Sequence, residues 1–182
     1  MTGENQSVEY IKVVANIIMK ELGLTPPGDP PSEETDDNRV FIYNQNFTIP
    51  TYKDMFIVLS ESPGKVIANV NRYDGDGENT KEVQELIMQR EINIDVMSRD
   101  DEARNRKEQV LMALASNYSQ QEQEKNGMRI FGHSVSFIDV SENEGGSRLF
   151  RYRASLFLHV KYSKEKAIDN YGYFSYNINT NR

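Results

Sequence analysis

The longest alternating stretch of the sequence, from Leu149 to Tyr162, constrains the fold more than any other feature. Its apolar side chains recur at every second position, which is the period of a β-strand with two different faces. A second alternation runs from Leu86 to Val96. Strands covered on both faces would instead read as continuous apolar runs. The two stretches therefore predict antiparallel strands with one face in water. The apolar face of the first contains Phe150, Tyr152, Ala154, Leu156, Leu158 and Val160, and its polar face contains Arg151, Arg153, Ser155, His159 and Lys161.

The charges on these two stretches are complementary. The polar face of the 149–162 strand is basic, and the polar face of the 86–96 strand includes Glu91 and Asp95. We expect these groups to pair across the sheet, an arrangement that supports packing and implies no ligand. Arg90 interrupts the apolar face, and we interpret it as a bulge or rim position.

Shorter segments add strands and helices to this sheet. Strand patterns are found from Val40 onward and over 55–59, 65–70 and 135–140. The turn residues Ser62-Pro63-Gly64 predict a hairpin between the 55–59 and 65–70 strands. The C-terminal residues 171–182 suggest one last strand. Apolar residues at steps of three and four predict one helix over 7–22, capped by Ser7 and closed by Gly23, and another over 98–125. A capping box of Ser98 and Asp101 opens the second helix, and Gly127 closes it.

These elements predict an α+β fold, a mostly antiparallel sheet packed against two main helices. The length of 182 residues suits a single domain. We divide the chain into an N-terminal helix (1–24), a proline-rich acidic arm or linker (25–38) and an α+β domain (39–182).

Composition excludes several classes of chemistry. The chain has no cysteine, which removes thiolate nucleophiles and cysteine-ligated metals, and it has two histidines. Its formal net charge of −7 disfavours direct binding of nucleic acid. No signal peptide and no membrane-spanning segment can be read from the sequence.

No motif supports an enzyme. Asp74, Asp76 and Glu78 have the spacing of a calcium loop, but Asn79 stands where such a loop needs glycine, so an acidic hairpin tip is the better interpretation. His133 and His159 have no third ligand at a suitable spacing. We therefore expect no metal, no cofactor and no catalytic centre. A hydrolase built on Ser134 or Ser136 with His133 and Asp139 remains an alternative, although it lacks a nucleophile elbow.

Several segments carry a resemblance to a known family. They are INIDVMSRDDEARNRKEQVLMALASNYSQQEQEKNG, FIDVSENEGGSRLFRYRASLFLHVKYS and IDNYGYF, and YNQNFTIPTYKDMF adds an early match. In this order the segments resemble the tail-terminator or neck-terminator proteins of tailed bacteriophages, over about two thirds of the chain. In its proline-rich acidic segment 25–38 the chain differs from a compact member of that family.

The resemblance implies a structural virion protein at the head–tail joint. It implies a homo-oligomeric ring, six subunits being the expected number, that ends the tail tube and contacts the tube protein and the head-completion or connector protein. Genomic DNA would pass through the lumen without specific binding, and no membrane would be involved. The protein would reside in the virion neck, and in the host cytoplasm during assembly. A compact subunit of this length would be about 40 Å across.

If the chain forms such a ring, charged loops are the candidate interface and lumen residues. We expect the acidic tip to pair with a basic neighbour or to face the lumen, and the arginines to meet acidic groups of the next subunit, unless they pair within their own chain. The candidates are Asp74, Asp76, Glu78, Glu142, Glu144, Arg148, Arg151 and Arg153. A rival interpretation is an acidic inhibitor that mimics DNA, which would concentrate carboxylates on one face.

Overall fold

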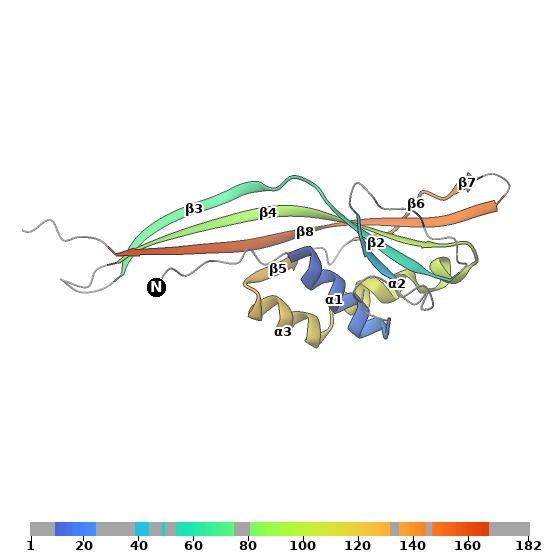
Figure 1. Ribbon diagram of the computed structural model, residues 1–182, viewed down its shortest axis with the longest axis horizontal. Helices are drawn as coiled ribbons and strands as arrows, with labels where there is room; N and C mark the ends of the chain where they lie inside the picture. The colour runs from blue at the N-terminus through green and yellow to red at the C-terminus, as the bar shows by residue number, and fades with distance from the viewer. Residues whose placement is uncertain are drawn as a thin grey trace, which may run out of the picture.

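The chain folds into an α+β structure in which one sheet carries three helices on one of its faces (Figure 1). The computed structural model describes residues 10–24, 39–43, 49, 54–74, 81–131, 135–144 and 147–167. Its helices are α1 (Tyr10–Leu22), α2 (Glu102–Leu114) and α3 (Asn117–Lys125). Its strands are β1 (Val40–Ile42), β2 (Phe56–Glu61), β3 (Lys65–Asp74), β4 (Lys81–Ser98), β5 (Met128–Phe131), β6 (Ile138–Asp139), β7 (Glu142–Glu144) and β8 (Ser147–Ala167).

Two long strands form the centre of the sheet. All 18 residues of β4 pair antiparallel with β8, from Lys81 opposite Ala167 to Ser98 opposite Phe150. The path through the sheet is β1-β2-β4-β8-β5, and β1 lies parallel to β2. The other pairings are antiparallel. The predicted antiparallel character of the long alternating segments is therefore confirmed.

The predicted hairpin at Ser62-Pro63-Gly64 is wrong. β2 and β3 do not pair with each other. Both pair with the same edge of β4, β2 with 92–97 and β3 with 81–89, and they run in the same direction. The turn-like residues mark only a short interruption, across which the Ser62 amide donates to the Glu91 carbonyl. Gly64 passes close to β4, since a Cβ there would lie 3.0 Å from Cγ of Arg90.

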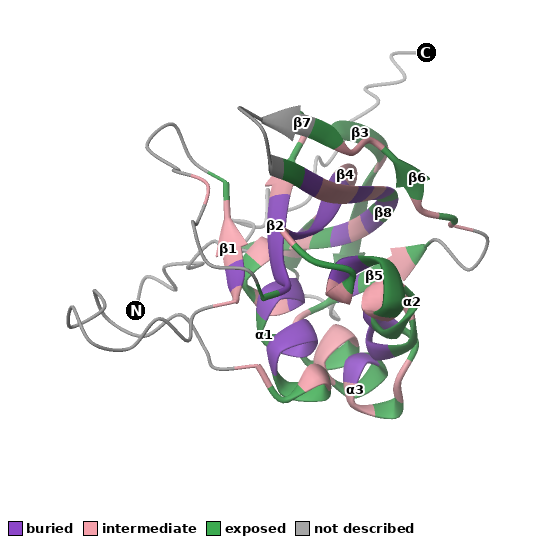
Figure 2. Cartoon of the chain, turned by 90° about the vertical axis from the view of Figure 1, so that its right-hand side faces the viewer, coloured by how far each residue is buried: buried purple, intermediate pink, exposed green. Residues whose placement is uncertain are grey.

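The larger hydrophobic cluster lies between the helices and one half of the sheet. A smaller one, made of Phe56, Val58, Met97 and Leu149, lies on the opposite face, which is therefore not wholly in water, contrary to the prediction. Val14 and Ile18 of α1 are fully buried, and they share a cluster with Ile94 of β4 and Leu158 of β8. Ile17 of α1 is also fully buried, because this helix contacts α2 and α3 as well as the sheet. Figure 2 shows the buried residues concentrated on α1 and on the central strands.

The predicted helix over 98–125 is two helices. α2 ends at Leu114 and α3 begins at Asn117, and the backbone of Ser116 between them is extended. The Ser116 hydroxyl accepts a hydrogen bond from the Ser119 amide at 3.0 Å, which is the contact of a helix N-cap. Serine competes with helical hydrogen bonding in this way, so a continuous apolar periodicity does not guarantee a continuous helix.

The ends of the helices follow the sequence signals more closely. Gly23 and Gly127 have positive φ angles of 65° and 61° and lie just after α1 and at the end of α3, as predicted. Ser98 is buried, and its hydroxyl accepts from the Ala103 amide at 3.0 Å. Asp101 makes no side-chain cap, so the predicted capping box is replaced by this bond and by Asp100, which accepts from the Glu102 amide. Ser7 lies outside the described residues.

The structure is elongated, so the expected diameter of about 40 Å is wrong. The 21 residues of β8 extend over about 70 Å at the usual rise of a strand. The helices cover only part of that length, and the remainder of the sheet projects beyond them (Figure 1).

Replacing Ser116 with Ala removes the N-cap of α3. We expect the free energy of unfolding to fall by about 1 kcal/mol, because the Ser119 amide loses its acceptor. Denaturant titration of the full chain measures this change. Ser116→Asp keeps a capping oxygen, so its loss should be much smaller, and equal losses in the two variants would contradict the assignment.

Candidate assembly surface

The part of the sheet that projects beyond the helices is the most unusual feature of the molecule. We define the sheet arm, below called the arm and distinct from segment 25–38, as residues 65–74 of β3, 81–89 of β4 and 159–167 of β8, which pair side by side. Its base, at Val160 and Tyr162, still contacts the core and α1, and its outer part projects beyond the helices (Figure 1). β3 is exposed along its length except at half-buried Ala68. Its apolar side chains are exposed as well: Val66 by 55%, Val70 by 48% and Tyr73 by 72%. A strand with this exposure is typical of a surface that another chain covers.

Ion pairs lie across one face of the arm. Glu85 of β4 forms ion pairs with Arg72 at 3.1 Å on one side and with Lys161 at 2.8 Å on the other. Lys81 and Glu165 pair at 3.3 Å nearer the tip. The hydrogen bond from Lys161 is the main reason that the pKa of Glu85 is lowered. These pairs join the three strands on the face where Val83, which is 4% exposed, also lies.

Arg90 marks the boundary between the arm and the body. Its guanidinium donates to Glu61 and, at 3.0 Å, to the Tyr162 hydroxyl, and its Nε is buried without a described partner. Tyr10 of α1 packs edge-on against Tyr162 at 5.9 Å between ring centroids. Arg90 therefore occupies the predicted rim position. The β-bulge lies elsewhere, between Val66 and Ala68 of β3.

The predicted charge pairing across the sheet is confirmed at Asp95. This carboxylate is buried, and both Arg151 and Arg153 bind it in bidentate fashion, with N–O distances between 2.8 and 3.1 Å. Asp95 lies directly opposite Arg153, whereas Glu91 lies opposite Phe157 and outside this cluster.

The cluster keeps Asp95 ionised. Burial raises the pKa of Asp95, but the hydrogen bonds and positive charges of Arg153 and Arg151 outweigh burial and hold the pKa below its usual value. Bidentate arginine–carboxylate contacts are among the strongest charged hydrogen bonds in proteins. Two of the three arginines proposed for the interface thus have a partner in their own chain.

The remaining predicted site residues lie at the two ends of the sheet, far apart. Asp74 is the last residue of β3, opposite Lys81 at the tip of the arm, so the acidic segment joins two strands of a hairpin as predicted. Asp76 and Glu78 lie outside the described residues. At the other end, Glu142 and Glu144 belong to β7, which pairs with the beginning of β8. Arg148 is exposed there, with its guanidinium 4.7 Å from the Phe150 ring centroid.

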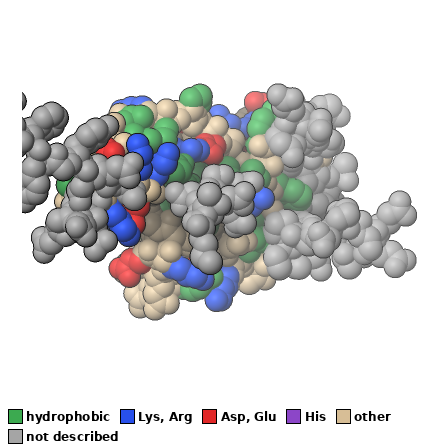
Figure 3. All heavy atoms as spheres, turned by 60° about the vertical axis from the view of Figure 1, so that its left-hand side comes forward, with side chains coloured by type: hydrophobic (Ala, Val, Ile, Leu, Met, Phe, Trp, Pro, Cys, Tyr) green, Lys and Arg blue, Asp and Glu red, His purple; other side chains and the backbone are tan. Residues whose placement is uncertain are grey.

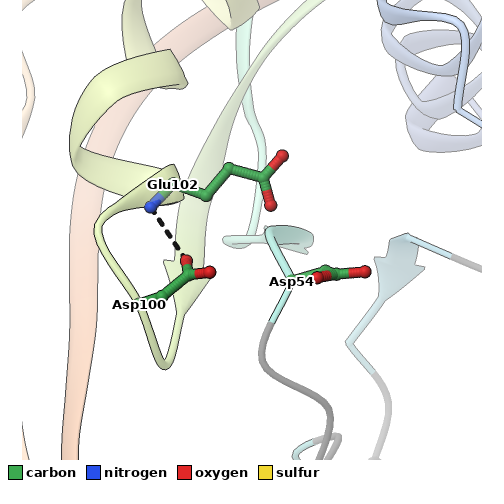
Figure 4. A group of neighbouring side chains, drawn as sticks. All are labelled: Asp54, Asp100 and Glu102. Carbon is green, nitrogen blue, oxygen red and sulfur yellow. Dashed lines mark hydrogen bonds between the residues drawn. The ribbon is translucent and has the colours of Figure 1, made fainter.

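One group of carboxylates has the spacing of a cation site. Oxygens of Asp54, Asp100 and Glu102 lie within 4.8 Å of one another (Figure 4). Each already has a donor: Asp54 accepts from Arg39 at 2.9 Å, Glu102 from Arg106 at 2.6 Å, and Asp100 from the Glu102 amide. Asp100 and Glu102 lie at the N-terminus of α2, where negative charge is favourable, and Asp54, which precedes β2, is balanced by Arg39.

The described surface also has two hollows. One, of about 480 Å³, lies between α2, α3 and β5 and includes Leu111, Gln123 and Met128. The other, of about 440 Å³, lies beside Asp95 and includes Tyr43 and Met97. Within the described residues neither lining contains a histidine.

The residues of the hydrolase alternative are only partly described. Ser136 is exposed. The histidine outside that alternative, His159, lies against Phe131 with ring centroids 4.1 Å apart and the rings tilted by 44°. Asp139 accepts from the amide and hydroxyl of Ser141, and these bonds lower its pKa. His133 and Ser134 lie outside the described residues.

Comparison with known proteins assigns no family to the chain. No protein-family model matches it, and no curated protein is significantly similar to it. Within the described residues no helix is long and apolar enough to span a membrane.

Replacing Asp95 with Asn leaves two arginines without their carboxylate. At pH 7 we expect the free energy of unfolding to fall by about 2–3 kcal/mol, less than for a fully buried pair because Arg153 is 41% exposed. The pKa of Asp95 is lower in the folded chain than the unfolded value of about 3.9. The contribution of the ionised carboxylate to the free energy of unfolding is therefore complete above about pH 3.9 and is lost as the pH falls through the folded pKa. Urea titrations from pH 7 down to pH 2 should therefore show the difference between the two proteins shrinking below about pH 4.

Exposed Arg148 provides the matched control. Arg148→Gln should change stability by less than about 0.5 kcal/mol, whereas Arg153→Gln should cost clearly more, since only Arg153 binds a buried carboxylate. Equal effects would show that the Asp95 cluster contributes little to folding.

We also predict that neither histidine is catalytic. Replacing His133 and His159 together with Gln should leave folding and assembly unchanged, as measured by circular dichroism and particle size. Loss of biological function with both of these intact would contradict this prediction.

Proposed function

We propose that this chain is a structural virion protein, the subunit of a ring that ends the tail tube of a tailed bacteriophage and joins it to the head. The observation that carries the proposal is the arm, a three-stranded projection with exposed apolar side chains on an otherwise well-packed body. It adds to the resemblance of several segments to tail-terminator proteins. Such a projection suits a subunit that becomes complete on assembly.

The elongated shape also supports this proposal. The tip of the arm and the β7–β8 hairpin lie at opposite ends of the long sheet (Figure 1). A subunit with two distant ends is able to contact different partners above and below the ring, here the tail tube and the head-completion protein.

The distribution of charge favours assembly over DNA mimicry. Figure 3, with the arm turned toward the viewer, shows basic, acidic and apolar side chains interspersed on that face. A DNA mimic needs a dense set of unpaired carboxylates, whereas Glu85 and Glu165 of the arm are paired with basic groups. The ionic contacts therefore fit a protein–protein surface better.

Light scattering on the purified full chain tests ring formation. We expect a species near six times the chain mass of 21.0 kDa, and negative-stain images of it should show rings with a central hole. In tailed particles assembled with an epitope-tagged chain, the label should lie at the head–tail junction. Label that is absent from that junction would overturn the proposed role.

Two exposed apolar residues allow a matched test of the arm. Tyr73 on β3 is 72% exposed, and Met112 on α2, away from the arm, is 71% exposed. Tyr73→Lys should leave a folded monomer that no longer forms rings, whereas Met112→Lys should assemble normally. Equal behaviour of the two variants would show that the arm is not part of the ring contact.

A further inference from the structure

The arm has two edges that no described strand covers. The edge of β3 that faces away from β4 has no described partner strand. On the other side, β7, β6 and β5 pair with β8 only as far as Val160. The outer edge at Lys164–Lys166 therefore also lacks a described strand. Exposed backbone edges of this kind readily accept a strand from another chain.

The two edges run in the same direction. β3 and β8 are both antiparallel to β4, so they are parallel to each other. Three rows of directly paired residues across the arm fix how the two edges are aligned along the strand direction. Asn71 and Lys164 flank Gln84, and Arg72 and Glu165 flank Val83. In the third row, Tyr73 and Lys166 flank Glu82.

We propose that β3 of one copy pairs in parallel with β8 of a second copy, in these same rows. This inference rests on the proposed function in one respect only, that copies of the chain contact one another. It names the surface, the partner strand and the register. Each copy offers one edge of each kind, so the contact is head to tail and closes into a ring when the rotation per subunit allows.

The charges on one face of the arm favour a second copy of this chain as the partner at its edge. Within a chain, Lys81 pairs with Glu165, and Arg72 pairs with Glu85. Pairing in the same rows places Arg72 of one copy beside Glu165 of the other. The four charged groups then form a diagonal series across the junction, Lys81, Glu165, Arg72 and Glu85, with alternating signs, and opposite charges on neighbouring strands are stabilising.

The other face and the alternative registers favour the same arrangement. Tyr73, which is 72% exposed, comes to lie beside Lys166 of the second copy, as a cation–π contact requires. A shift of two residues in one direction would place Asp74 beside Glu165, two like charges, and a shift of two in the other direction would place Val70 there and lose the contact of Arg72 with Glu165. A shift of one residue would turn each side chain of the strand to the opposite face.

The absence of cysteine from the sequence permits a direct test by disulfide formation. In the full chain, Asn71→Cys and Lys164→Cys are combined. Within one chain these positions are two strand spacings apart, about 10 Å, which is too far for a disulfide. Between copies in the proposed register they are adjacent, about 5 Å apart, so mild oxidation should give dimers and a ladder of larger covalent species on a non-reducing gel.

The matched control keeps the same strands and the same face but breaks the register. Val66 lies opposite Met88, four β4 residues and about 13 Å from the row of Asn71. The double variant Val66→Cys with Lys164→Cys should therefore cross-link at least tenfold more slowly. The inference is overturned if the two double variants react equally fast. It is also overturned if Asn71→Cys alone dimerises as fast as the first double variant, which would indicate that β3 pairs with itself or that the contact is random.

The outcome is separable from the proposed virion role, because the cross-linking uses purified protein. A ladder from a chain that is absent from head–tail junctions supports the edge pairing and contradicts the virion role. Rings that form without the ladder contradict the edge pairing and place the ring contact on another surface.

Discussion

The antiparallel pairing of β4 with β8 is the constraint on which the rest of the described structure depends. It runs without interruption from Lys81 opposite Ala167 to Ser98 opposite Phe150. With the exception of β1, which pairs with β2, each further strand pairs with the outer edge of one of these two. A slip of one residue in this register would turn every apolar side chain of one strand toward the wrong face, so the core and the arm share a single alignment.

This one ladder passes through two environments. In the body, Ile92 and Ile94 are buried beneath the helices, which supplies the apolar burial that stabilises the fold. In the arm, the same strands continue beyond the helices, where β3 is exposed and ion pairs join the strands. Among the described side chains of the arm only Val83 and Val160 are buried, so the arm takes its geometry from the body and has little apolar burial of its own. A second copy that covers its edges would provide that burial, which is why we associate the arm with assembly.

Asp95 shows how a charged cluster can serve the fold and mislead an interpretation of function. Arg151 and Arg153 were candidates for contacts with a neighbouring subunit, and both bind Asp95 of their own chain. Reversing their charges would therefore disturb the sheet itself before it tested any interface. Among the described candidate residues, those in the arm and at the opposite end of the sheet, where β7 and Arg148 lie, remain candidates for contacts with a partner.

The sequence by itself determined the elements whose signals are local. Alternation identified β4 and β8, glycines identified the ends of α1 and α3, and charge patterns identified the partners of Asp95. Tertiary structure decided the rest. Leu86 and Ile94 belong to the same alternation, yet Leu86 is half-buried in the arm and Ile94 is fully buried in the core. The turn residues before β3 likewise suggested a hairpin, but β4 is long enough to pair with β2 and β3 in succession. Periodicity reports which face of a strand is apolar, whereas the neighbour of that face depends on residues distant in the chain.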